Sequence, residues 1–298
     1  MKEPKSVFAA VAWVAFFVLL SFGTTASSAT TFAHIELVEG IVTIVDDKGQ
    51  SRIPHVGDAV EEGDTITTGG DGELQMLTED HGLIAVRSNT KMKVEAYRAD
   101  GNAEDTSVIS LFSGTFRSIT GWIGTFNRNN YQIKTPTAVI AIRGTDHEPF
   151  HVPEPGPGEQ AVAPPGTYDK VNSGSTAIRN NAGEVVVNPN EVGFAPHDTK
   201  SAPRISKAIP DFYRPSRKES RIEQRKAEVE KEIVHRRTER QNKRPPKEHP
   251  KGQNKHSEER VQHHANQVQR NLHNQAATSH KVRHERHRVR IPATPSKP

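Results

Sequence analysis

The sequence contains no cysteine. This absence excludes a disulfide framework, a thiol nucleophile, thiolate zinc or iron–sulfur sites, and a lipobox cysteine for lipid attachment. Large apolar side chains are also scarce, because hydrophobic residues make up 33% and aromatic residues 6% of the 298 positions. With so little apolar surface to bury, we expect part of the chain to lie outside any hydrophobic core.

The sequence also lacks the short motifs of several enzyme classes. It has no Gly-x-Ser-x-Gly elbow, no Gly-x-x-x-x-Gly-Lys-Ser/Thr phosphate loop and no His-Glu-x-x-His motif. Carboxylates stand beside histidines at 80–81 and 146–148, but neighbouring residues of a strand point to opposite faces. We interpret both groups as solvated turn residues and predict a non-enzyme without catalytic residues, cofactor or metal site. A carbohydrate-active enzyme with an unrecognised carboxylate pair is one alternative.

Charge is distributed unevenly along the chain. The formal net charge of +4 is the sum of −10 over residues 1–200 and +14 over residues 201–298. Such asymmetry is typical of an ordered acidic domain that carries a basic arm.

The N-terminal segment, residues 1–29, has the pattern of a secretory signal peptide. Lys2 and Lys5 precede an apolar run over residues 7–22, and small residues follow over 23–29. We expect cleavage after Ala26 or Ala29 and a periplasmic or otherwise exported mature chain. An uncleaved signal anchor in the membrane is the alternative.

Residues 34–196 are predicted to form one β-domain. Short β-branched or alternating runs are separated about every ten residues by turn signals, and no convincing amphipathic helix lies between them. This spacing predicts a mainly β fold, an antiparallel β-sandwich or roll. A loop is expected over 149–165, which holds six prolines in 17 residues, and a hairpin within 167–196. Strands are expected at 35–37, 41–45, 73–78, 83–86, 91–97, 108–112, 132–134, 139–142, 176–179 and 184–187.

Residues 135–146, Thr-Pro-Thr-Ala-Val-Ile-Ala-Ile-Arg-Gly-Thr-Asp, resemble the signature strand of the FecR domain family. Upstream, 56–60 (Val-Gly-Asp-Ala-Val), 62–69 (Glu-Gly-Asp-Thr-Ile-Thr-Thr-Gly) and 111–114 (Leu-Phe-Ser-Gly) fit the same family pattern in the same order. The resemblance covers about residues 40–150. The residues that carry it are Gly57, Asp58, Gly63, Asp64, Thr135, Pro136, Arg143, Gly144 and Thr145.

We expect these motif residues to be mainly structural. The six-residue spacing of Gly57, Gly63 and Gly69 indicates tight turns that require a positive φ. Pro136 suits the start of a strand, because its ring fixes φ and removes a donor. Arg143 follows a buried strand and is expected to pair with Asp58 or Asp64, with a ligand contact as the alternative.

The resemblance implies a role in envelope sensing. FecR-type sensors typically place a cytoplasmic sigma-factor-regulating segment before one membrane helix and the FecR domain in the periplasm. Only residues 1–6 precede the apolar run here. We therefore expect a stand-alone exported FecR-domain protein without that regulatory segment.

The basic tail, residues 201–298, has little with which to build a core. From 215 onward there is no aromatic residue and there are ten Val, Ile, Leu or Met in 84 positions, so disorder is the default. Helices are expected at 216–241, with Ile222, Val229 and Ile233 on a thin stripe, and after Ser257. For both we favour a solvated or transient helix over a coiled coil with a partner.

The partners that the tail suggests are anionic. His280, His284 and His287 have a helical spacing compatible with metal ligation, but neighbouring Lys and Arg side chains would repel a cation. An exported basic tail favours an envelope polyanion, an anionic membrane surface or an unknown protein, whereas nucleic acid is not expected. The preferred function is a binding or scaffold module in envelope sensing or assembly. A polyanion- or nucleic-acid-binding protein that acts through the tail is a further alternative.

Overall fold

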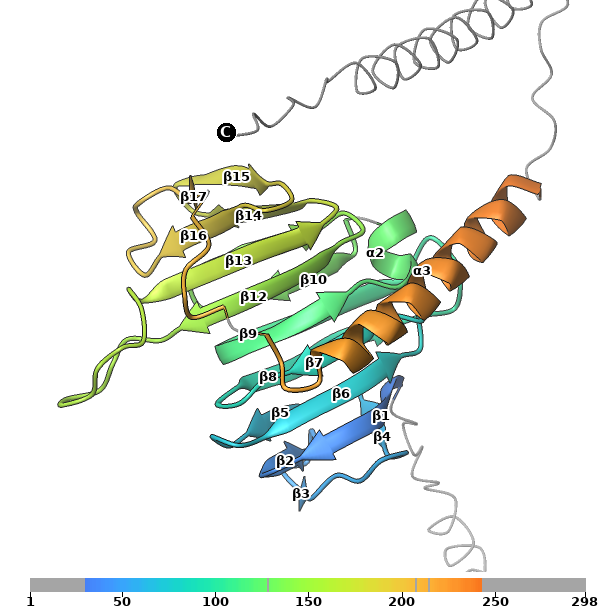
Figure 1. The fold of residues 1–298 in the computed structure, drawn as a ribbon, viewed down its shortest axis with the longest axis horizontal. Helices are drawn as coiled ribbons and strands as arrows, with labels where there is room; N and C mark the ends of the chain where they lie inside the picture. The colour runs from blue at the N-terminus through green and yellow to red at the C-terminus, as the bar shows by residue number, and fades with distance from the viewer. Residues whose placement is uncertain (1–29, 128, 207, 214, 243–298) are drawn as a thin grey trace, which may run out of the picture. The chain divides into compact units, whose positions relative to one another are not determined.

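The computed structural model describes residues 30–127, 129–206, 208–213 and 215–242. These residues contain 17 strands and two helices, so the prediction of a mainly β fold is confirmed (Figure 1). The predicted signal peptide, the second tail helix and the tail histidines from His249 onward lie outside the described residues. Neither described helix combines the length and the apolar character that a membrane span requires.

Nine strands form the first layer, sheet A. All neighbours in this layer are antiparallel. In spatial order they are β4 (Ala59–Glu61), β1 (Thr31–Glu39), β6 (Glu73–Thr78), β7 (Leu83–Val86), β9 (Thr106–Ile119), β12 (Asp146–Val152), β13 (Gly166–Ser173), β16 (Val192–Pro196) and β17 (Arg204–Ser206).

The second layer, sheet B, also has nine strands because β9 belongs to both layers. In spatial order they are β3 (Ser51–Arg52), β2 (Val42–Val45), β5 (Thr65–Thr68), β8 (Lys91–Arg98), β9, β10 (Tyr131–Lys134), β11 (Val139–Ile142), β14 (Thr176–Asn180) and β15 (Gly183–Val187). Only β9 and β10 are parallel among these described pairs. The short helix α2 (Trp122–Phe126) lies in the connection that parallel pairing requires.

A glycine lets β9 pass from one layer to the other. Residues 106–113 pair with β8 in sheet B, whereas residues 114–119 pair with β7 and β12 in sheet A. Gly114 lies at the change of layer with a φ of 79°, and an added Cβ would come within 2.5 Å of the Asn89 carbonyl oxygen. The strand expected at 108–112 therefore extends further, because the freedom of Gly114 at positive φ lets it bend and continue to Ile119.

The main hydrophobic core lies between the two layers. Alternation along the strands turns every second side chain inward, as in β8, where Met92 and Val94 are fully buried between exposed Lys91 and partly exposed Lys93. The largest fully buried core side chains are Phe32, Phe116, Ile35, Ile44, Ile66, Leu74, Met76, Ile84, Met92, Ile109 and Leu111.

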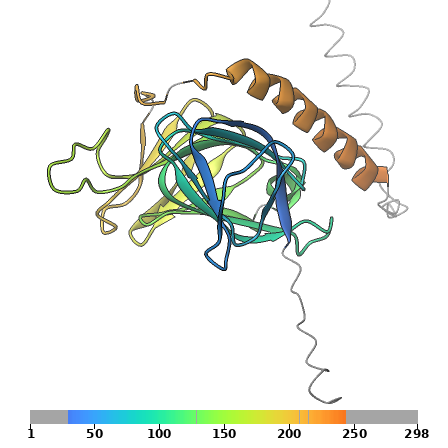
Figure 2. The ribbon, with the colours of Figure 1, turned by 90° about the horizontal axis from the view of Figure 1, so that it is seen from below.

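Helix α3 (Glu219–Asn242) packs on the outer face of sheet A (Figures 1 and 2). Ile222 and Val229, with 0% and 3% exposure, contact Leu83, Ala85 and Ile119. The predicted stripe on this helix is therefore real, but the interpretation of a solvated helix is wrong. The apolar outer side chains of β7 and β9 supply a partner within the same chain, and a helix with a thin apolar stripe gains its stability from such packing.

The proline-rich segment also differs from its predicted form. Strand β12 includes Pro149, which pairs in register with Asp169 of β13, so the predicted loop starts later than residue 149. The ladder between β12 and β9 skips residues 148 and 149. Thr115 Oγ1 donates instead to the Pro149 carbonyl oxygen at 2.8 Å. A proline is tolerated inside this strand because the missing donor coincides with a gap in the ladder.

Candidate functional site

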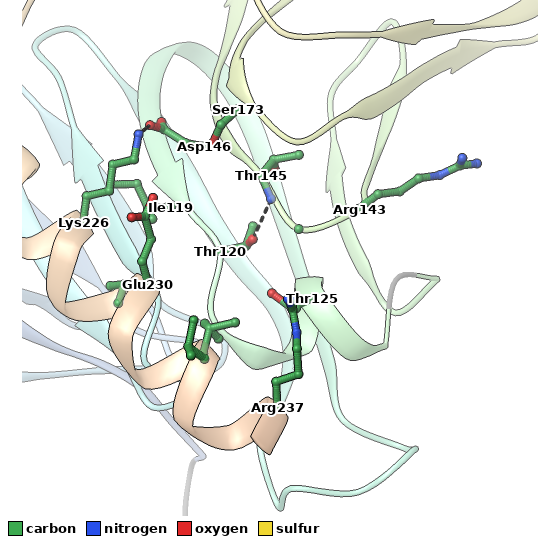
Figure 3. A pocket seen from close by; sticks show the side chains of 14 residues that line it. Ile119, Thr120, Thr125, Arg143, Thr145, Asp146, Ser173, Lys226, Glu230 and Arg237 are labelled. Carbon is green, nitrogen blue, oxygen red and sulfur yellow. Dashed lines mark hydrogen bonds and ion pairs between the residues drawn. The ribbon is translucent and has the colours of Figure 1, made fainter. Parts of the chain in front are cut away.

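A cavity of about 470 Å³ lies between α3 and the turn that joins β11 to β12 (Figure 3). This volume is in the range of small-ligand sites. One wall carries hydroxyl groups, and the wall formed by α3 carries both aliphatic and charged side chains. The lining residues are Ile119, Thr120, Thr125, Arg143, Gly144, Thr145, Asp146, Ser173, Lys226, Val229, Glu230, Ile233, Val234 and Arg237.

The Arg-Gly-Thr turn of the predicted family motif forms one side of this cavity. Gly144 has a φ of 70°, which ends β11 and reverses the chain. The next residue is fixed by two hydrogen bonds: Thr145 N donates to Thr120 Oγ1 at 2.8 Å, and Thr120 N donates to the Thr145 carbonyl oxygen at 2.9 Å. The turn is therefore held rigidly against the end of β9.

The hydroxyl group of Thr145 is a polar atom without a partner. The residue is 4% exposed, and its Oγ1 has no hydrogen bond within the described part of the chain. A buried polar group without a partner is costly, so such groups in native structures require an explanation. One explanation is a ligand in the adjoining cavity, to which the Thr145 hydroxyl would donate a hydrogen bond or from which it would accept one.

Beside the turn, Asp146 is held in a buried ion-pair network under α3. Arg117 of β9 donates to both carboxylate oxygens, at 2.8 and 2.6 Å, and Lys226 of α3 donates at 2.8 Å. Burial alone would raise the pKa of Asp146, but the hydrogen bonds from Arg117 and Lys226 outweigh it and hold that pKa well below its usual value. Asp146 is therefore a permanent carboxylate with a structural partner on each side.

Glu148, two residues further along β12, belongs to the same network. Lys170 and Arg87 contact its two carboxylate oxygens at 2.7 and 3.1 Å. Burial opposes ionisation here as well, and the hydrogen bond from Lys170 lowers the pKa of Glu148 in spite of it. From α3, Glu219 contacts Arg117 and lies 3.9 Å from Arg87. The network thus fastens the start of α3 to sheet A.

The interpretation of residues 80–81 and 146–148 as solvated turns is wrong for their carboxylates. Asp80 and Asp146 are each 1% exposed. Asp80 accepts a hydrogen bond from the Ile123 amide at 3.2 Å in the first turn of α2, and burial raises its pKa. A short strand-end sequence could not reveal that a helix and a second sheet cover these positions.

The argument that adjacent strand residues point apart is confirmed for Asp146 and His147. Asp146 faces α3, whereas His147 is fully buried and contacts Asp169 of β13 at 2.7 Å. Thr176 Oγ1 donates to the other carboxylate oxygen of Asp169 at 2.6 Å. Histidine, aspartate and threonine meet here, but their burial inside the sandwich denies a substrate access.

The Thr-Pro-Thr part of the motif joins the two sheets. Thr135 Oγ1 accepts from the Ala138 amide at 2.9 Å and so closes the turn around Pro136 between β10 and β11. Thr135 and Thr137 each place a hydroxyl 2.6 Å from that of Thr167 in sheet A. The Thr167 hydroxyl also contacts His151 Nδ1 at 3.0 Å.

The remaining motif residues lie away from the cavity. Gly57 and Gly63 have the expected positive φ, 94° and 93°, but Gly69 does not. Asp58 Oδ2 accepts from the His55 amide at 2.8 Å in a turn. Asp64, 1% exposed, pairs with Arg52 at 2.6 Å.

Arg143 does not form the ion pair predicted with Asp58 or Asp64. It is exposed, and its side chain points away from the interior of the cavity (Figure 3). The parity of the strand explains this: Ile142 points into the core, so the next side chain points out.

Sequence reasoning missed Arg117, Asp169 and Lys226. Arg117 stands in Phe-Arg-Ser-Ile, where alternation puts it on the face opposite Phe116, but only the packing of α3 makes that face buried. In the described residues no group of three His, Asp or Glu side chains is arranged to hold a metal ion.

These features define a β-sandwich with a helix on one outer face and a cavity beside that helix. Residues 64–155 match the family model described as FecR protein. The matched residues include the Thr-Pro-Thr turn, the signature strand and the Arg-Gly-Thr turn.

Solved structures give further matches. One match is a cell surface anchoring domain with 26% sequence identity and a TM-score of 0.20. The alignment covers 21% of this chain and 82% of the anchoring domain. Two crystal structures of a protein assigned as an anti-sigma factor from Parabacteroides distasonis are 12% identical, with TM-scores of 0.35 and 0.36. Those alignments cover 48% of this chain and 58% of the other. No curated protein sequence matches the chain.

Proposed function

We propose that this chain is a non-catalytic, exported FecR-domain module that binds an envelope component and serves sensing or assembly. The family match supports a sensing or regulatory role. The signal-peptide pattern of residues 1–29 supports export. The basic tail provides a second contact, to an anionic surface or partner.

One observation carries the non-catalytic part of this proposal. The two carboxylates of β12 that follow the motif turn are held in structural pairs, with Asp146 between Arg117 and Lys226, and Glu148 between Lys170 and Arg87. A general base must be able to reach a substrate proton, and a nucleophile must be able to approach the reacting atom. These two carboxylates are already occupied and buried, whereas the cavity beside them has the volume of a small-ligand site.

The experiment compares binding and turnover by the same protein. Full-length chain purified from the exported fraction is titrated with envelope glycans and with anionic lipid vesicles, and the recovered ligands are analysed for cleavage products. We expect saturable binding with every ligand recovered intact. Release of shortened glycans, lost in a variant with an altered carboxylate, would overturn the non-catalytic assignment.

Two further measurements address location and the tail. Cell fractionation of the tagged full-length chain should place it outside the cytoplasm, and a cytoplasmic location would contradict the export proposal. A chain ending at Asn242 keeps every described residue but removes much of the basic tail. We expect it to keep binding specificity and to lose affinity most strongly at low ionic strength.

A further inference from the structure

The outer face of sheet B differs from that of sheet A because no described segment packs across it as α3 does. Lys91, Lys134 and Arg179 are exposed on this face, and the Lys93 side chain is 37% exposed. Arg143 follows β11 with the same outward parity.

The strand register aligns three of these cations in one row. Residues paired directly across neighbouring strands point to the same side of a sheet. When such pairs follow one another from strand to strand, their side chains form a row that crosses the strands. The row runs through Thr65, Lys93, Ser110, Lys134, Val139, Arg179 and Glu184. Lys93, Lys134 and Arg179 therefore occur on every second strand.

The spacing of this row is regular. Neighbouring strands lie roughly 5 Å apart, so successive cations of the row are about 10 Å apart at their backbones. Small or aliphatic side chains, Ser110 and Val139, separate them. A linear partner lying along the row would meet a positive charge at each interval of two strands.

The cations of this face stand out in an acidic domain. Residues 30–200 contain 13 Lys or Arg and 24 Asp or Glu. Ion pairs hold Arg52, Arg87, Arg98, Arg117 and Lys170. Among the described residues no such pair is found for Lys91, Lys134, Arg143 or Arg179.

Two acidic side chains also lie on this face. Glu95 is 3.8 Å from Lys93, and Glu184 stands beside Arg179 at the end of the row. Counting Lys91, Lys93, Lys134, Arg143 and Arg179 against these two leaves a cationic surface on a domain of opposite net charge. Such a concentration attracts an anionic partner over a distance set by the ionic strength.

An aromatic ring adjoins the row. Phe112 is 41% exposed, and Lys91 Nζ lies 6.0 Å from its ring centre. Phe112 and Ser110 point to the same side of β9, two residues apart. An exposed ring beside cations offers a flat apolar platform for the C–H face of a sugar.

We propose that the outer face of sheet B binds a linear acidic polysaccharide that carries a carboxylate on alternate sugars. The inference rests on the proposed binding function and names its ligand class. A pyranose unit is about as long as the distance between neighbouring strands, so carboxylates on alternate units meet Lys93, Lys134 and Arg179 in turn. Phe112 stacks on a sugar at the edge of the row.

The spacing favours this ligand over nucleic acid. Double-stranded DNA carries a charge about every 1.7 Å along its axis, much denser than cations about 10 Å apart. Single-stranded nucleic acid is recognised by several aromatic platforms in succession. This row is flanked by the single ring of Phe112 within the described face.

The test uses the full-length chain and a hyaluronan decasaccharide, which has carboxylates on alternate sugars. The variant Lys93→Gln/Lys134→Gln/Arg179→Gln removes the row. The control Lys48→Gln/Lys200→Gln/Lys231→Gln removes the same charge from exposed positions elsewhere. Each lost contact should weaken binding about three-fold, so we expect roughly 30-fold for the row variant. The control should stay within about two-fold.

Comparison ligands identify what is recognised. A neutral maltodextrin should not bind, and single-stranded DNA of equal charge should bind through the tail, with the same affinity for the row variant and the control. In a third variant Gln replaces Lys281, Arg283, Arg286 and Arg288. This change should abolish DNA binding, and the 30-fold difference for hyaluronan should persist when the row variant and the control are each combined with it. Unchanged melting temperatures confirm that all variants are folded.

The outcomes separate this inference from the proposed function. If the wild type does not bind hyaluronan, or the row variant binds as the control does, the inference is wrong, although binding of another ligand keeps the function. If DNA responds to the row variant as hyaluronan does, the face recognises charge alone and the polysaccharide assignment fails. Cleavage of the decasaccharide contradicts the non-catalytic function but not the row.

Discussion

The two sheets of the sandwich use charged side chains on their outer faces in opposite ways. On sheet A, Arg117 is 4% exposed and is held by Asp146 beneath α3. On sheet B, Arg179 is exposed, and the described residues provide no ion pair for it. The same residue type thus fastens a helix on one face and is available to a partner on the other.

The difference follows from what covers each face. Residues 208–213 and 215–242 return across sheet A, where Phe212 and Tyr213 pack on Phe150, and Ile222 packs on Leu83. Between these two apolar contacts the chain buries ion pairs, which cost several kcal/mol in desolvation and are tolerated only when each charge is compensated. An exposed cation carries no such requirement, so its loss affects binding and hardly affects folding.

The largest expected effect comes from replacing Arg117. Arg117→Ala leaves Asp146 buried with Lys226 as its remaining charged partner, and we expect a loss of about 3–5 kcal/mol in the free energy of unfolding. Urea unfolding at pH 7 measures this loss. Arg179→Ala is the matched control on sheet B, with an expected change of less than about 0.5 kcal/mol. Similar losses in the two variants would remove the distinction between the faces.

The next effect tests the apolar attachment of α3. Ile222→Ala removes a fully buried side chain at the contact with Leu83 and should destabilise helix docking by about 2–3 kcal/mol. Amide hydrogen exchange should then show faster exchange in α3 than in the strands. Val234, 59% exposed, provides the control Val234→Ala. If α3 keeps its protection in Ile222→Ala, the apolar stripe does not hold it.

The β-structure was largely predictable because alternation and turn residues are local signals. The runs 73–78 and 83–86 coincide with β6 and β7, and the expected hairpin corresponds to β14 and β15. Strand β12 was missed because it contains a proline and only two apolar residues besides, Phe150 and Val152. Its outer side chains are buried by α3 and by residues 212–213, which follow more than 50 positions later.

The candidate site was predictable only in part. The motif located the Arg-Gly-Thr turn, and the cavity is indeed beside it. The second wall comes from α3, whose thin stripe gave no indication that it docks. The row on sheet B depends on register across seven strands, which short-range patterns do not determine.

A pH effect distinguishes the interior from both outer faces. Burial lowers the pKa of His151 to about 4, with the charge of His197 adding to the effect. Since the unfolded value is about 6.5, the unfolded state binds more protons in this range, and stability falls as the pH drops from about 6.5 towards 4. We expect a loss of roughly 1–2 kcal/mol between pH 7 and pH 5.

The variant His151→Gln should flatten this pH profile, because the amide can still contact Thr167 but does not titrate. His34→Gln provides the control, since the His34 side chain is 56% exposed. Urea midpoints at several pH values measure the difference. If the profile keeps its slope without His151, another group causes the pH dependence.

The smallest expected effect is that of replacing Thr145, and its neighbour Thr120 at the covered face provides the contrast. Thr120 Oγ1 accepts the Thr145 amide at 2.8 Å, whereas Thr145 Oγ1 has no partner among the described residues. Thr120→Val leaves a buried amide unpaired and should cost about 1–3 kcal/mol, but Thr145→Val removes a hydroxyl that makes no bond and should change stability by less than about 0.5 kcal/mol. Thermal unfolding of both variants measures the contrast.

A large loss for Thr145→Val would mean that its hydroxyl is already bonded, for example to water, and is not available to a ligand. A neutral result, together with weaker ligand binding, would assign the Thr145 hydroxyl to recognition, so that the covered face would contain one binding group among its structural pairs.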